Sequence, residues 1–167
     1  MTTFTAGQKV RASQINQHVL LFGMASADLT STSDTTLSNV TGMAVAVEAD
    51  SVYVLDGWVG YTSTSATPDL KAAFTVPAST TGFWTLFGMD TADASPGDIN
   101  SAYAAALTTT LVAGTDATFT QQSAAIYGFV DTAGTAGTLQ FQAAQNTSSG
   151  TAMVVKTGSW IRLQKVA

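Results

Sequence analysis

The sequence predicts an all-β fold, an antiparallel β-sandwich of jelly-roll type. Nine or ten short segments alternate apolar and polar residues with a period of two, and they recur at a spacing of roughly 8–12 residues. Stretches rich in Gly, Pro, Asn, Asp and Ser separate them, as expected for turns. Charged residues make up only 10% of the 167 residues, whereas hydrophobic residues make up 46%. A surface this poor in charge favours a protein whose surface is largely covered by other subunits, and the alternative is a secreted or extracellular β-protein.

The N-terminal residues differ from the rest of the chain. Ser13 is a candidate N-cap, and Ile15, Val19 and Phe22 follow at helical spacing before Gly23, so we expect a short helix here. Its apolar stripe either docks onto another protein or caps one end of the chain's own sandwich. We therefore divide the chain into a docking arm at residues 1–27 and a jelly-roll domain at residues 28–167.

The strands follow in order from the alternation and the turn residues. Gly42 is expected to interrupt the first strand, Pro77 to end the third, and residues 91–101 to form a loop. We expect strands at residues 36–48, 52–63, 68–77, 82–89, 108–112, 115–120, 124–131, 139–143, 152–156 and 160–164.

The longest of these strands, residues 52–63, is apolar on both faces. One face carries Tyr53, Leu55, Val59 and Tyr61, and the opposite face carries Val52, Val54 and Trp58. A strand of a two-layer sandwich ordinarily has one buried and one solvated face. The second apolar face therefore predicts a contact between subunits, for which Tyr53, Trp58 and Tyr61 are the candidate residues.

Charge and composition exclude several classes of protein. The net charge is −5, and no basic stripe typical of a nucleic-acid-binding domain is visible. There is no cysteine, which excludes disulfides and thiolate metal sites. The N-terminus has no apolar core of a signal peptide, and no apolar run is long enough to cross a bilayer. We therefore expect a chain made in the cytosol that binds neither nucleic acid nor membrane.

No constellation of residues predicts an enzyme, a cofactor or a catalytic centre. His18 is the only histidine and lacks partners for a triad or a metal site. Asp90, Asp93 and Asp98 share one loop, but their spacing does not match a calcium-binding loop. Glu48 and Asp56, the pair considered for glycoside hydrolysis, have no fixed separation and are expected at a rim.

The aromatic residues allow two interpretations. Aromatic rings stack on sugars, which suggests carbohydrate binding, but the same residues are enriched in cores and subunit interfaces. We expect most of them in the core or the interface, with Trp84 and Trp160 as the two that could be exposed.

Two parts of the sequence resemble virion proteins of tailed bacteriophages. Segment FTAGQKVRASQIN is similar to the opening of many phage tail and head accessory proteins, at Phe4, Gly7, Val10, Ala12, Ile15 and Asn16. The rest of the chain resembles trimeric jelly-roll domains of tumour-necrosis-factor/complement type on phage virions. The segments that carry this resemblance are Leu37–Val40, GMAVAVEADSVYVLDGWVGYTS, DLKAAFTVPA, AAIYGFVDT, GTLQFQAAQN and GSWIRLQKV, and the aromatic-rich long strand and the closing segment match best. Together these parts cover most of the chain.

This resemblance implies a homotrimer, with the long strands packed around a three-fold axis. It implies a structural protein of the virion, made in the host cytoplasm, that decorates the capsid or forms a spike bound to the major capsid protein. The alternative is a minor tail or baseplate protein that attaches to a host surface glycan or protein. Docking to the particle would bury the apolar Phe4, Val10, Ile15, Val19 and Phe22, while Lys9 and Arg11 would meet acidic groups.

Overall fold

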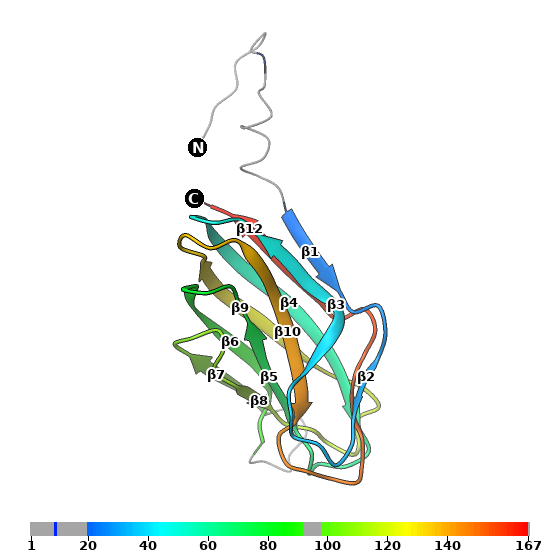
Figure 1. Ribbon diagram of the computed structural model, residues 1–167. Helices are drawn as coiled ribbons and strands as arrows, with labels where there is room; N and C mark the ends of the chain where they lie inside the picture. Colours follow the sequence, from blue (N-terminus) through cyan, green and yellow to red (C-terminus); the bar gives the residue numbers. More distant parts are fainter. Residues whose placement is uncertain (1–8, 10–19, 92–97, 167) are drawn as a thin grey trace.

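The computed structural model describes Lys9, residues 20–91 and residues 98–166. Within this part of the chain, all regular structure is β, and two antiparallel sheets pack face to face (Figure 1). The strands are β1 (Leu20–Met24), β2 (Leu29–Ser31), β3 (Ser38–Val47), β4 (Val52–Ser63), β5 (Leu70–Thr75), β6 (Thr81–Met89), β7 (Ile99–Ala104), β8 (Leu111–Ala113), β9 (Gln122–Asp131), β10 (Gly137–Gln145), β11 (Met153–Val155) and β12 (Trp160–Lys165).

The larger sheet has eight strands and the smaller has four. In the larger sheet the order is β1-β12-β4-β9-β6-β7, and β11 joins it by pairing with β4 and β2. In the smaller sheet the order is β3-β10-β5-β8. Strands far apart in the sequence are thus neighbours in both sheets, as in a jelly roll. This confirms the fold class predicted from the sequence.

The core fills the space between the two sheets. Alternate residues of each strand point inward, so the larger sheet contributes Tyr53, Leu55 and Trp84, and the smaller contributes Phe74 and Phe141. Phe74 lies edge-on to both Trp84 and Phe141, with ring centroids 5.1 and 5.3 Å apart. Trp84 is fully buried, and its indole N–H donates to the carbonyl of Thr109 at 3.2 Å. The expectation that Trp84 could be exposed was therefore wrong.

The predicted helix is not formed where the structure describes its residues. Leu20–Met24 is strand β1, which pairs along its whole length with Trp160–Gln164 of β12. Phe22 is therefore a strand residue, and Leu20–Met24 is part of the sandwich. Three apolar residues at helical spacing favour a helix only weakly. Pairing with the edge of β12 gives the backbone of this segment hydrogen-bond partners, which favours a strand. Residues 10–19 of the expected helix lie outside the described residues.

Three other elements also differ from the prediction. Strand β3 runs through Gly42, which adopts a φ of 89° at a register shift opposite β10, so the glycine forms a bulge instead of a break. The second half of the expected loop at 91–101 continues into β7, which pairs with β6. Residues 115–120 form turns instead of a strand, and Thr118 donates to Asp116 from its backbone N–H at 2.6 Å. No helix of the described residues is long and apolar enough to cross a membrane.

Asp28 ties the segment after β1 to the turn between β11 and β12. Its carboxylate accepts hydrogen bonds from the backbone N–H and the hydroxyl of Thr157, at 2.7 and 2.8 Å, and forms an ion pair with Lys156. The hydrogen bond from Lys156, followed by those from Thr157, lowers the pKa of Asp28 to about 2 from 3.8. The ionised form of Asp28 is therefore more stable in the folded protein than in the unfolded chain.

We expect Asp28→Asn to lower the melting temperature at neutral pH, because it removes the ion pair with Lys156. The decrease should be only about 2–3 °C, because the pair is exposed to solvent. A lowered pKa in the folded state means that this stabilisation is present above about pH 4 and disappears as the pH falls through about 2. Thermal unfolding of the native chain and the variant between neutral and acidic pH measures this difference. A melting-temperature difference that stayed constant across the range would contradict the assignment.

Candidate functional site

The outward face of the larger sheet carries an unusual number of large apolar side chains. Among the described residues, nine of the eleven exposed large hydrophobic residues lie on this face. Monomeric soluble proteins rarely expose contiguous apolar patches of this kind. The nine are Leu20, Phe22, Met24, Val54, Phe83, Phe87, Ile99, Tyr103 and Tyr127.

Strand register arranges these side chains in rows across the sheet. We call the row nearest the start of β1 and β4 the first row; it contains Leu20, Gln164, Val54, Phe129 and Phe83. The second row contains Phe22, Arg162, Asp56, Tyr127, Thr85 and Tyr103. The third row contains Met24, Trp160, Trp58, Ala125, Phe87 and Ser101.

Neighbouring aromatic rings contact one another within and between these rows. Phe83 stacks on Phe129 with ring centroids 5.9 Å apart and lies 6.2 Å from Tyr103. Phe22 stacks on Trp160 at 5.9 Å. Because the rings hold one another in place, the face presents a largely pre-ordered apolar surface, and less side-chain entropy is lost when it is covered.

The central charges of the face neutralise each other. Arg162 donates from Nε and Nη2 to the two carboxylate oxygens of Asp56, at 2.9 and 2.7 Å, and its guanidinium lies 5.8 Å from the centroid of the Trp160 ring. The hydrogen bond to Asp56 raises the pKa of Arg162. A bidentate pair that is already formed can be covered by another protein without leaving an unpaired charge behind.

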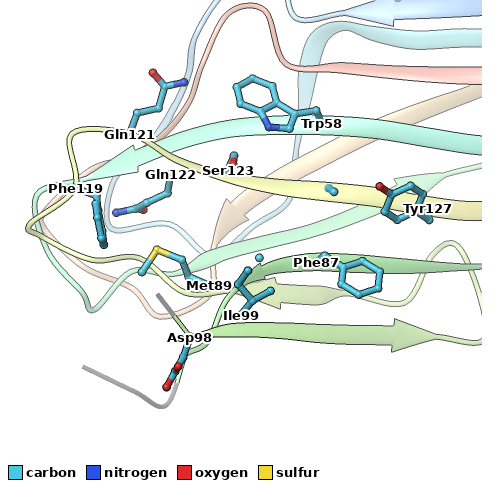
Figure 2. Close-up of a pocket in the computed structure, with 12 residues that line it drawn as sticks. Trp58, Phe87, Met89, Asp98, Ile99, Phe119, Gln121, Gln122, Ser123 and Tyr127 are labelled. Atoms are coloured by element: carbon cyan, nitrogen blue, oxygen red, sulfur yellow. The ribbon is translucent and has the colours of Figure 1, made fainter. Parts of the chain in front are cut away.

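A pocket of about 670 Å³ opens where the third row meets the loops at the far end of the sheet (Figure 2). Its apolar wall is formed by rings of the sheet, including Trp58, Phe87 and Tyr127, together with Phe119 of the loop before β9. The remaining lining residues are Gly88, Met89, Asp98, Ile99, Gln121, Gln122, Ser123 and Ala125.

Gln122 is the one polar side chain of this pocket that is almost fully buried, with 5% of its surface exposed. Its Nε2 donates to the carbonyl of Asp116 at 2.5 Å. Its Oε1, in contrast, has no hydrogen-bond partner among the described residues. This oxygen is out of reach of solvent, and a buried acceptor without a partner costs free energy.

The structure separates the three residues expected at a subunit contact. Tyr53 and Tyr61 are 1% and 0% exposed and pack in the core of their own chain, so their side chains are not available to another subunit. The hydroxyl of Tyr61 donates to the carbonyl of Gly114 at 2.8 Å, and burial raises its pKa. Trp58 lies on the outward face, half-buried, and lines the pocket.

Most of the expected docking residues lie outside the described part of the chain. These docking residues are Phe4, Val10, Arg11, Ile15 and Val19. His18 and Asp93, which were candidates for metal binding, also lie outside the described residues. Lys9 is described and exposed, and Phe22 lies in the second row of the outward face.

The acidic residues that were considered for chemistry are engaged elsewhere. Glu48 forms an ion pair with Lys165 at 2.7 Å, and Asp56 pairs with Arg162, so the two carboxylates have separate structural partners. The backbone N–H of Asp90 donates to the carbonyl of Asp98 at 3.1 Å. Among the described residues, no three acidic or histidine side chains are grouped so that they could hold a metal ion.

Comparison with known proteins finds neither a matching protein-family model nor a matching curated protein. Three solved structures show a distant similarity. The tripod from the baseplate of bacteriophage Tuc2009 is 10% identical, with a TM-score of 0.37 over 98% of this chain and 73% of the other. Chains of infectious bursal disease virus, strains Gt and Gx, are 11% and 12% identical, with TM-scores of 0.27 and 0.24 over 90% and 88% of this chain. This chain spans 38% and 40% of their lengths, and similarities this distant carry no argument about function.

Proposed function

We propose that this chain is a homotrimeric structural protein of a tailed-phage virion, attached to the capsid as a decoration or spike by its N-terminal arm. The observation that carries the proposal is the outward face of the larger sheet. It is apolar, ring-stacked and internally neutralised, which are properties of a surface that another protein covers. The resemblance of the sequence to phage virion proteins supplies the number of subunits and the kind of particle.

The subunit contact that we propose uses the apolar residues of the first row together with Tyr103 of the second row. They lie at the end of the sheet where β1 begins (Figure 1). A second copy fits this surface because its own face offers the same apolar rings and no unpaired central charge. The interface residues are then Leu20, Val54, Phe83, Phe129 and Tyr103, in place of Tyr53 and Tyr61.

Sedimentation of the purified chain tests the assembly. A trimer of the 17.1 kDa chain has a mass of about 51 kDa, roughly three times that of the monomer. A monomer that stays monomeric at high protein concentration would disprove the assembly. Cryo-electron microscopy of the particle then tests the location: density at three-fold positions of the shell supports a capsid decoration.

A second candidate function is that of a minor tail or baseplate protein that attaches to the host. The pocket favours it, because it lies at the end of the sheet away from the start of β1 and would face outward from a particle bound by the arm. Density confined to the tail in the same micrographs would select this function over decoration.

Deleting residues 1–19 should leave a folded trimer that no longer joins the particle. The folded sandwich begins at β1, so this deletion removes no strand of the described structure. Three arms on one trimer bind with avidity, so the loss of particle binding should be nearly complete. Pelleting of particles assembled without the native chain measures incorporation, and sedimentation measures the trimer.

A deletion of residues 1–24 is the matched control for this experiment. It also removes β1 and exposes the edge of β12, so it should lower the stability of the domain itself. If the shorter deletion were incorporated at the native level, the arm would not be the attachment site.

A further inference from the structure

The pocket beside Trp58 has the composition of a site for a ligand that is apolar on one face and rich in hydroxyl groups at its edges. Trp58, Phe87 and Tyr127 present rings from β4, β6 and β9, while Gln121, Gln122 and Ser123 lie where the preceding loop enters β9 (Figure 2). Rings offer flat apolar contact, and amides and a hydroxyl offer both donors and acceptors. The two kinds of group meet in one space of about 670 Å³, within the range of ordinary ligand sites.

We infer that this pocket binds an uncharged saccharide of about two pyranose rings. A pyranose has an apolar C–H face that suits an aromatic ring and hydroxyl groups around its rim that pair with amides. The exposed amide of Gln121 and the exposed hydroxyl of Ser123, which both line the pocket, are the groups that pair with hydroxyls of the sugar. This inference deepens the second candidate function, host attachment, and depends on the pocket of a single chain.

The same residues exclude two other classes of ligand. Among the described residues no lysine or arginine lines the pocket, so an anionic sugar such as a sialoside would find no cation from this part of the chain. A wholly apolar ligand would cover the exposed amide of Gln121 and the exposed hydroxyl of Ser123 without pairing them, which disfavours it. An uncharged, hydroxyl-rich ligand is the class that satisfies both walls.

Trp160 provides a matched control for Trp58. The two tryptophans face each other across β12 and β4 in the third row, and both are half-buried on the outward face. Trp58 lines the pocket, whereas Trp160 contacts Phe22 and Arg162 and is not among the lining residues. Replacing either one with alanine removes a similar amount of aromatic surface from the same face.

Saturation-transfer NMR on the full-length protein tests the inference with maltose, cellobiose, lactose and chitobiose as probes and sialyllactose as the anionic comparison. We expect saturation of the C–H protons of one pyranose face for at least one uncharged disaccharide, and weaker transfer to sialyllactose than to lactose. Trp58→Ala should weaken binding on the order of tenfold or more, because the stacking surface is lost, whereas Trp160→Ala should change it by less than about twofold. Phe119→Ala, in the loop outside the sheet, should weaken binding as well.

Absence of saturation transfer to every disaccharide would overturn the inference, as would equal effects of Trp58→Ala and Trp160→Ala. Preferential binding of sialyllactose would overturn the uncharged class of ligand. If Trp58→Ala instead lowered the mass of the assembly and no sugar bound, the pocket would be filled by a second copy of the chain. That result overturns the saccharide site and leaves the proposed trimer standing, so the two proposals fail separately.

Discussion

Replacing Val54 with aspartate should yield a folded monomer and abolish the trimer. Val54 is 47% exposed at the centre of the first row, between Gln164 and Phe129. In the proposed assembly a copy of the chain covers this row, so the new carboxylate would be buried beside apolar rings and near Asp56. An unpaired buried charge costs roughly 3–5 kcal/mol, and the trimer would carry three of them.

Ala46→Asp is the control for this variant. Ala46 is exposed on the outward side of β3, in the smaller sheet, where no subunit contact is proposed. The control should keep the native sedimentation, and circular dichroism should show both variants folded. If Val54→Asp sedimented as the native assembly does, the first row would not be the interface.

Trp84→Ala should destabilise the domain more than any other single replacement considered for this chain. The indole is fully buried between the sheets, lies edge-on to Phe74, and donates a hydrogen bond to Thr109. Removing it leaves a large cavity and an unpaired carbonyl, at a cost of about 3–5 kcal/mol. This is a large part of the free energy of unfolding of a typical domain, so the variant should be partly unfolded at physiological temperature.

Chemical denaturation of the Trp84 variant measures this cost directly. Trp160→Ala serves as the reference, because Trp160 is half-buried and its loss removes mainly the stack on Phe22, worth about 1 kcal/mol. A shift of the denaturation midpoint no larger for Trp84→Ala than for Trp160→Ala would contradict the placement of Trp84 in the core.

Alternation along the strands was the part of the sequence that predicted the structure best. Tyr53, Leu55, Val59 and Tyr61 do share one face of β4, and Leu139, Phe141 and Ala143 share the buried face of β10. The pattern could not say which apolar face of β4 was inward, because both faces are apolar. The tyrosines were therefore assigned to a subunit contact although their side chains fill the core.

Uncertainty about which face of a strand points inward also explains the wrong prediction for Trp84. In β6, Phe83 and Phe87 alternate with Trp84 and Leu86, and either set could have been buried. The pairing of β6 with β9 and β7 decides the matter, and that pairing joins segments whose distance in sequence carries no local signal.

The pocket could not be predicted because its walls come from four separate segments. Trp58, Phe87, Ile99 and Phe119 are brought together only by sheet order. The apolar alternation at 115–120 predicts a strand, whereas the structure forms turns there and places Phe119 in a loop. The paired glutamines at 121 and 122, which follow Phe119 after one intervening residue, were the one local signal that could have drawn attention to the pocket.

The position of β12 between β1 and β4 has a consequence for how the protein is made. Arg162 and Asp56 pair across this strand although 106 positions separate them in the chain. On a ribosome, β4 emerges long before β12 exists, so one edge of this long apolar strand waits without a partner. Closure of so distant a pairing is slow, and the larger sheet completes only after its last strand has been synthesised. Synthesis rate and chaperone supply should therefore affect the yield of soluble protein more strongly than they affect its final stability.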